Sequence, residues 1–193
     1  MQRMAGAVAV LLGSGTLAQS AVLIEIDDPV LEPGVSTGVL LSAAFPATDY
    51  AMCCILTDLL ASSDAGTWSD LEVVAPMDGP GASAGAVTPA GIEGILGGQL
   101  NFPPAGSGPS PDNPIAFWRG TYTAPDDVAA PLDLDLITQT TRFEVYIADG
   151  DPTPVSRLDG LVEASATIRV VPAPGAGLLL AGLLLGGGRR RRA

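Results

Sequence analysis

The chain has 193 residues, with nine Arg, no Lys, 21 Asp and Glu, no His and two Cys, and its formal net charge is −12. Without His, it cannot carry a Ser-His-Asp or Cys-His catalytic system or an imidazole metal site. Two Cys exclude a four-Cys zinc site and a dense disulfide framework. Because phosphate recognition needs a cationic surface, this acidic chain is not expected to bind nucleic acid.

The first 20 residues are predicted to be a secretory signal peptide. Arg3 supplies the positive start, and residues 4–17 form an apolar stretch diluted by Gly and Ser. Ala18 and Ser20 are then the small residues at positions −3 and −1 before Ala21. Signal peptidase is therefore an expected partner, cutting after Ser20. A buried N-terminal helix is the alternative, but the stretch lacks the polar face that such a helix normally shows.

Residues 21–171 form the predicted body, which carries 21 acidic residues and four Arg, a formal charge of −17. Short apolar runs separated by Gly and Pro, several with alternating polarity, predict an all-β domain. We expect a single antiparallel β-sandwich, Ig-like or jelly-roll-like, flanked by a signal-peptide helix and a C-terminal apolar helix. The expected strands are residues 22–26, 38–45, 70–75, 92–96, 100–102, 115–123, 132–137, 143–148 and 161–171. Residues 50–61 fit a buried strand or a short helix, with the strand favoured, and residues 103–114 are predicted to be a loop.

Cys53 and Cys54 are adjacent within the expected strand of residues 50–61. Alternation in a strand would point the two side chains to opposite faces, and a disulfide between neighbours would close a small strained ring. Two small, apolar, buried or half-buried thiols are favoured over a redox or intermolecular role.

Two further patterns suggest ligands. Trp118 and Tyr122 are spaced to lie on one strand face, where they would either stack on sugar rings or pack in the core, and the core is favoured. Asp149-Gly150-Asp151 begins like a calcium loop, but Thr153, Pro154 and Gly160 occupy later positions where an EF-hand needs a ligand, Gly and Glu. The pairs Asp27-Asp28, Asp126-Asp127 and Asp133-x-Asp135 are no more specific, so no cofactor or metal is predicted.

The last segment, residues 172–193, is set apart from the body. Pro172 and Pro174 end the body because proline cannot continue a strand ladder or sit inside a helix. Residues 176–188 carry no polar side chain, and a helix of that length would span about 20 Å against the roughly 30 Å core of a bilayer. The run Arg189, Arg190, Arg191 and Arg192 can snorkel, and the positive-inside rule places it in the cytoplasm. The membrane is thus an expected partner, with the acidic body on the other side.

Three parts occur here in order: Val171-Pro172-Ala173-Pro174, the Gly/Leu-rich residues 175–188 and the Arg run. Together they resemble the C-terminal sorting signal of PEP-CTERM proteins, in the variant with a Val-Pro-x-Pro motif; Ala173 replaces the Glu of Pro-Glu-Pro. The resemblance implies a Gram-negative surface protein that is processed by an exosortase and released or attached outside, often beside exopolysaccharide or biofilm matrix. It covers only the tail and implies nothing about the body. A plain membrane anchor that is never cut is the alternative.

The sequence therefore predicts an exported, non-enzymatic protein of the cell surface or extracellular matrix, anchored in the membrane only transiently. A carbohydrate- or calcium-dependent binding module is one alternative, and a plain C-terminally anchored periplasmic protein is another. A hydrolase using two carboxylates is a third, although no pair of acids is distinguished by its spacing.

Overall fold

The structure, a computed structural model, describes residues 19–99, 113–150 and 152–172. Within these residues every regular element is a strand. The strands are β1 (Ala21–Ile26), β2 (Val30–Leu31), β3 (Ser36–Ala44), β4 (Ala51–Ala61), β5 (Thr67–Val73), β6 (Ser83–Thr88), β7 (Gly91–Gly98), β8 (Ile115–Thr123), β9 (Leu132–Tyr146), β10 (Val155–Ser156) and β11 (Ser165–Val170).

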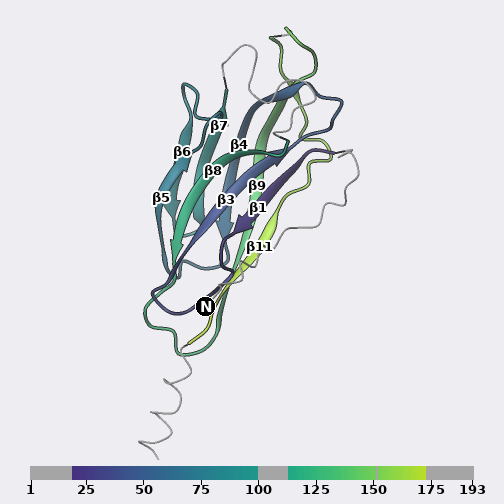
Figure 1. Ribbon diagram of the computed structural model, residues 1–193. Helices are drawn as coiled ribbons and strands as arrows, with labels where there is room; N and C mark the ends of the chain where they lie inside the picture. Colours follow the sequence, from purple (N-terminus) through teal and green to yellow (C-terminus); the bar gives the residue numbers. More distant parts are fainter. Residues whose placement is uncertain (1–18, 100–112, 151, 173–193) are drawn as a thin grey trace, which may run out of the picture.

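The strands form two sheets that pack face to face (Figure 1). The four-stranded sheet has the order β1-β3-β8-β5, and the larger sheet has the order β2-β11-β9-β4-β7-β6, with β10 paired to β9. The predicted β-sandwich is confirmed. The expectation of a wholly antiparallel sandwich is wrong at one edge, because β2 pairs with β11 in parallel, Val30 opposite Arg169 and Leu31 opposite Val170.

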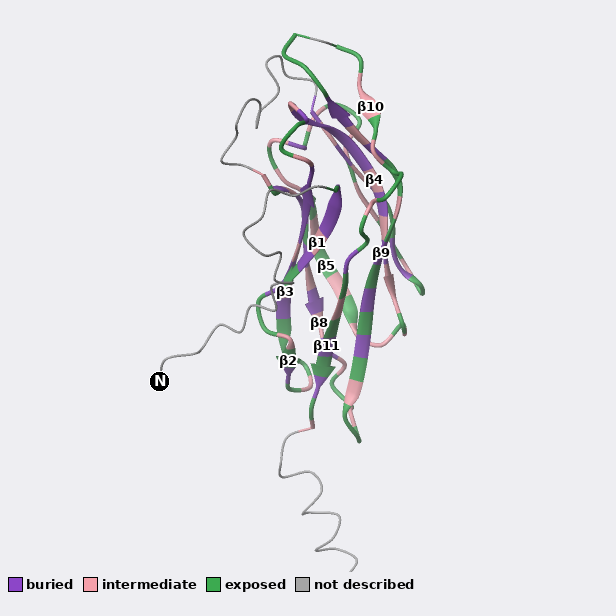
Figure 2. Cartoon of the chain, turned by 90° about the vertical axis from the view of Figure 1, so that its right-hand side faces the viewer, coloured by how far each residue is buried: buried purple, intermediate pink, exposed green. Residues whose placement is uncertain are grey.

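One apolar core lies between the sheets, and Figure 2 marks the buried residues, which alternate with exposed ones along strands such as β9. Alternation produces this core: along β9, Leu134, Leu136, Phe143 and Val145 are buried, and the residues between them are exposed or half-buried except for the buried Thr138. The largest fully buried side chains, Trp118, Tyr122 and Phe117, all come from β8.

β-Bulges interrupt the alternation in two central strands. Leu41 pairs with Trp118 and Ser42 with Ala116, so Phe117 is an extra residue in β8, and Phe117 and Trp118 both join the core. In β4, Met52 pairs with Val145 and Cys54 with Glu144, so Cys53 is the extra residue. Because a bulge shifts the side-chain phase by one residue, neighbours in sequence then share a face.

The structure confirms the expected strands near residues 22–26, 38–45, 92–96 and 115–123, and it shows residues 51–61 as a strand. Residues 132–137 and 143–148 were expected as two strands but belong to the single strand β9, which ends at Tyr146. The expected strands 70–75 and 161–171 are shifted or shortened to β5 and β11, and β2, β6 and β10 were not expected. The strand of residues 100–102, most of the loop 103–114 and both flanking helices lie outside the described residues. In the part of the chain that the structure describes, no helix is long and apolar enough to cross a membrane.

Candidate functional site

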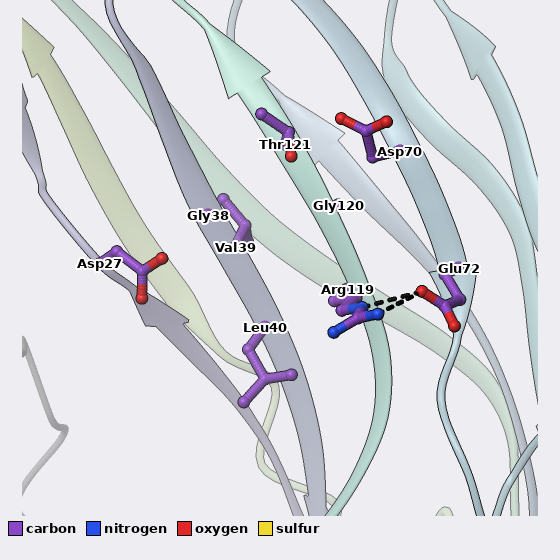
Figure 3. A pocket seen from close by; sticks show the side chains of 9 residues that line it. All are labelled: Asp27, Gly38, Val39, Leu40, Asp70, Glu72, Arg119, Gly120 and Thr121. Atoms are coloured by element: carbon purple, nitrogen blue, oxygen red, sulfur yellow. Dashed lines mark hydrogen bonds and ion pairs between the residues drawn. The ribbon is translucent and has the colours of Figure 1, made fainter.

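A broad groove of about 490 Å³ lies on the outer face of the four-stranded sheet. Strands β3, β5 and β8 and the residue after β1 contribute its lining (Figure 3). Asp27 stands on one side of the groove and Asp70 and Glu72 on the other, with Leu40 and Arg119 between them. The groove is open to solvent, so a large ligand can reach it.

Small residues on neighbouring strands hollow out the sheet surface. Gly38 of β3 pairs with Thr121 of β8, so neither strand raises a large side chain at this point. A Cβ on Gly38 would collide with the Asp27 carboxylate, which lies directly over this glycine. Glycine at position 38 therefore lets the Asp27 carboxylate lie against the strand, and a side chain there would displace this carboxylate.

The groove is predominantly acidic. Three carboxylates, those of Asp27, Asp70 and Glu72, line it with a single cation, Arg119. Arg119 donates from Nε and Nη2 to Glu72 Oε2, at 2.9 and 2.6 Å. Both side chains are more than half exposed, so this ion pair contributes little to stability. With Arg119 neutralised by Glu72, the remaining carboxylates give the groove a negative potential that favours a cationic ligand.

A second candidate site is the cluster of Cys53, Cys54 and Glu144, called here the thiol cluster. The bulge in β4 brings both sulfurs to the same side of the strand, so the expectation that they point to opposite faces is wrong. One ligand atom from each of the three residues lies within 4.8 Å of the other two. Both Cys are free and 8% exposed, which confirms the expectation of small buried thiols.

Hydrogen bonds link the members of the thiol cluster to their neighbours. Cys54 Sγ donates to Glu144 Oε2 at 3.1 Å, and Arg142 Nη2 donates to the same oxygen at 2.7 Å. The Arg142 hydrogen bond lowers the pKa of Glu144. Hydrogen bonding from Cys54 lowers the pKa of Cys53 to about 6 although burial opposes it, and the same contact and burial raise the pKa of Cys54.

Trp118 and Tyr122 do not form a sugar-binding platform. Both are fully buried, Trp118 Nε1 donates to the Ala84 carbonyl at 3.0 Å, and Tyr122 donates its hydroxyl to the Ala65 carbonyl at 2.9 Å. Trp68 packs against both rings. The structure thus confirms that these aromatics are core residues.

The predicted processing residues flank the described fold. Ser20 is buried and accepts a hydrogen bond from Val162 N through its carbonyl, and Ala21 begins β1. Val171 follows β11 and donates its N–H to the Leu31 carbonyl at 2.8 Å. Pro172 lines a second open hollow together with the acidic residues Glu32, Asp126 and Asp127. Ala18, Ala173, Pro174, Arg189, Arg190, Arg191 and Arg192 lie outside the described residues.

The acidic patterns noted in the sequence do not converge on a metal site within the described residues, where the thiol cluster is the group of three possible metal ligands. Asp149 accepts a hydrogen bond from the Tyr50 hydroxyl at 2.9 Å, and Asp151 lies outside the described residues. Sequence reasoning missed the groove because its lining comes from four separate segments. Two glycines were local pointers to it: Gly120, inside the expected strand 115–123, and Gly38, at the start of the expected strand 38–45.

No family model and no curated protein matches the chain in sequence. In fold, it is similar to the seventh ScaB type I cohesin from Pseudobacteroides cellulosolvens, with a TM-score of 0.57, 14% identity and coverage of 80% of this chain and 92% of that one. It is also similar to the cohesin–dockerin complex Coh-OlpC–Doc435 from Clostridium thermocellum (TM-score 0.52, 10% identity, 83% and 99% coverage). A third similar structure is CaCohA2 from Clostridium acetobutylicum (TM-score 0.51, 16% identity, 86% and 99% coverage). The described body therefore has a cohesin-like β-sandwich fold.

Proposed function

We propose that this protein is a non-enzymatic binding module that captures a partner protein in the groove of the four-stranded sheet and is presented outside the cell by its C-terminal tail. The observation that carries the proposal is the groove itself: it is wide, open and lined by side chains from several strands. Such a surface suits a folded partner better than a small substrate, which is usually held in an enclosed, mostly apolar pocket.

The fold likeness supports a binding role, because one of the similar structures is a cohesin in complex with a dockerin. Fold alone does not assign a function, so the charge of the groove is needed to define the partner. Asp27, Asp70 and Glu72 outnumber Arg119, and the chain as a whole has a charge of −12. We infer that the partner presents Lys or Arg side chains to the groove, since complementary charge steers association and excludes acidic partners.

The ends of the described fold support the export and sorting part of the proposal. Strand β1 begins at Ala21, the residue that would become the N-terminus after signal peptidase acts. Strand β11 ends at Val170, immediately before the Val171-Pro172-Ala173-Pro174 motif. Neither cleavage would remove a residue of a described strand, although the first would remove the hydrogen bond from Val162 N to the Ser20 carbonyl, so the mature protein would keep the groove. We propose that an exosortase processes the tail and that the product resides at the cell surface or in the exopolysaccharide matrix.

Crosslinking from the groove tests the binding part. A photoreactive apolar residue at Leu40, in the groove, is compared with the same residue at Ile137, which is 50% exposed on the larger sheet. In cells expressing the full-length chain, we expect one dominant protein adduct from position 40 and none from position 137. Equal adducts from both positions, or no adduct from position 40, would contradict the proposal.

The intact mass of the mature protein tests the sorting part. We expect a mass that lacks residues 1–20 and the Arg run, and an unprocessed C-terminus when Pro172 and Pro174 are both changed to Ala. A mature protein that retains its four terminal Arg would favour the plain membrane anchor. This result would leave the groove proposal untouched, because the two experiments concern separate parts of the chain.

A further inference from the structure

We propose that the thiol cluster is a binding site for a thiophilic divalent metal ion, with Zn²⁺ the reference ion, held by the two thiolates of Cys53 and Cys54 and a carboxylate oxygen of Glu144. This site lies on the larger sheet and is independent of the groove. It differs from the four-Cys site that the composition excludes, because the protein supplies only three ligands and the fourth position is left open.

The arrangement of the ligand atoms fits a tetrahedral ion. With Zn–S bonds near 2.3 Å and Zn–O bonds near 2.1 Å, the two sulfurs should be about 3.8 Å apart and each about 3.6 Å from the oxygen. In the structure the three ligand atoms all lie within 4.8 Å of one another, so closing around an ion requires side-chain shifts of about 1 Å or less. The bulge in β4 makes this possible, because regular alternation would have separated the sulfurs.

The charges around the site also suit a bound divalent ion. From two neutral thiols, binding breaks two S–H bonds, releases two protons to solvent and forms two Zn–S bonds and one Zn–O bond, so the total charge of the site does not change. If Cys53 is already a thiolate, one proton is released and the site becomes one unit less negative. The thiol hydrogen bond from Cys54 to Glu144 is replaced by coordination of both residues to the same ion. Arg142, already 2.7 Å from Glu144 Oε2, stays as the partner that orients the carboxylate.

A metal site is better supported than a disulfide between the same two residues. Consecutive Cα atoms lie about 3.8 Å apart, below the separation of most disulfide-linked residues. In addition, the backbone here is held extended on both sides. Cys54 pairs with Glu144 of β9 and with Gly98 of β7, and the Cys53 carbonyl accepts a hydrogen bond from Gln99 N at 3.0 Å. Closing a small ring would require these hydrogen bonds to break.

The fourth coordination position has room for water or an exogenous ligand. A pocket of about 200 Å³ lies against the two Cys, and Pro80, Gly81, Ala82 and Arg142 are among the other residues that line it. Gly97 and Gly98 line part of the pocket and have no side chain that would fill it. The pocket gives an ion a path to the buried sulfurs, which are otherwise 8% exposed.

Cobalt substitution tests the proposal on the full-length chain, purified with its thiols reduced. We expect Co²⁺ to produce a near-ultraviolet sulfur-to-cobalt charge-transfer band that saturates at one equivalent and is removed by one equivalent of Zn²⁺. Cys53→Ser and Cys54→Ser should each weaken Co²⁺ binding about tenfold or more, and Glu144→Gln should weaken it while keeping the charge-transfer band.

Asp133→Asn is the control, because Asp133 also lies near an Arg, at 3.6 Å, on the larger sheet but outside the thiol cluster and the groove. This variant should bind Co²⁺ like the unchanged protein. Circular dichroism of each variant separates loss of a ligand from loss of the fold. The proposal is overturned if the folded, reduced protein gives no charge-transfer band, if both Ser variants bind Co²⁺ with unchanged affinity and band intensity, or if the purified protein proves to contain a Cys53–Cys54 disulfide that reforms in the presence of Zn²⁺.

Discussion

Arg157 holds the carboxylate of Asp49 with two hydrogen bonds, from Nε to Oδ2 at 3.0 Å and from Nη2 to Oδ1 at 2.8 Å, across 108 residues of sequence. The Asp49 side chain is only 2% exposed, whereas Arg157 remains one-third exposed. The contact ties the turn between β3 and β4 to the segment that follows β10. Hydrogen bonding to Asp49 also raises the pKa of Arg157, which keeps the guanidinium charged.

Removing the guanidinium of Arg157 should leave the buried carboxylate of Asp49 without a charged partner. We expect Arg157→Met to lower the free energy of unfolding by about 3 kcal/mol, because Asp49 would lose both charge-assisted hydrogen bonds without regaining water. Urea unfolding of the purified protein measures the change. Arg119→Met, which removes an exposed ion pair, is the control and should cost at most about 1 kcal/mol. Equal losses of unfolding free energy in the two variants would show that the buried Asp49–Arg157 pair contributes no more to stability than the exposed pair of Arg119.

The charge of the groove should control partner association. We expect Asp27→Lys to weaken binding of the partner crosslinked from position 40 by about tenfold or more, mainly through slower association. Surface plasmon resonance at two salt concentrations is the measurement, and the salt dependence should shrink in the variant, since ions screen exposed charges. Asp133→Lys on the larger sheet is the control, because Asp133 is also exposed and lies near an Arg, at 3.6 Å. An identical loss in both variants would refute a localised acidic groove.

Gly91 is expected to be intolerant of any side chain. Its φ is +128°, and an added Cβ would collide with the Leu59 carbonyl of the neighbouring strand. We expect Gly91→Ala to cost about 2–3 kcal/mol of stability, since backbone must move and the conformation is strained for an L-residue. At Gly81, φ is +91° but nothing lies within 4 Å of an added Cβ, so Gly81→Ala should cost only about 1 kcal/mol. Thermal unfolding of the two variants provides the comparison.

Tyr122 should make stability fall in alkaline solution. Burial raises the pKa of Tyr122 above its usual value of 10.0. Above pH 10, the Tyr122 hydroxyl therefore keeps its proton in the folded state but loses it in the unfolded state. The contribution of Tyr122 to stability is complete below pH 10 and is lost as the pH rises toward the pKa of the folded state. Tyr122→Phe should lose about 1 kcal/mol at neutral pH, with its hydrogen bond to Ala65, but should decline less steeply above pH 10. Urea unfolding at neutral and alkaline pH tests this, and parallel declines would contradict it.

Alternation was enough to predict the sandwich and the position of most strands, because burial on one face leaves a period of two in the sequence. It failed where polar residues face inward. The break expected between residues 137 and 143 is instead continuous strand. There the Thr138 hydroxyl donates to Glu163 at 2.6 Å, and the Thr140 and Thr57 hydroxyls lie 3.0 Å apart. Such hydrogen bonds satisfy buried polar side chains. A hydropathy pattern assigns these residues to a loop, because it takes polar residues to be exposed. Strand β6 was missed because its residues, Ser-Ala-Gly-Ala-Val-Thr, are mostly small.

Neither candidate site could be predicted from local sequence. The thiol cluster depends on a β-bulge, and no residue type around Cys53 and Cys54 indicates where β4 contains its extra residue. The groove depends on the lateral order β1-β3-β8-β5, in which β8 lies between strands from earlier in the chain. The core role of Trp118 and Tyr122 was predictable, since large aromatic residues in an alternating strand are normally buried.

The position of the last strand has a mechanical consequence. Strand β11 joins β9 through six antiparallel register pairs, and Val171 and Pro172 continue directly from it. A force applied at Pro172 along the strand axis would load the six β9–β11 pairs together, in shear. It would not separate them one after another, as happens when a hairpin is unzipped. If the tail is held and a partner is pulled from the groove, the tension passes from one sheet to the other through the apolar core. Under such tension, the six β9–β11 pairs and the core between the sheets would share the load between the tail and the groove.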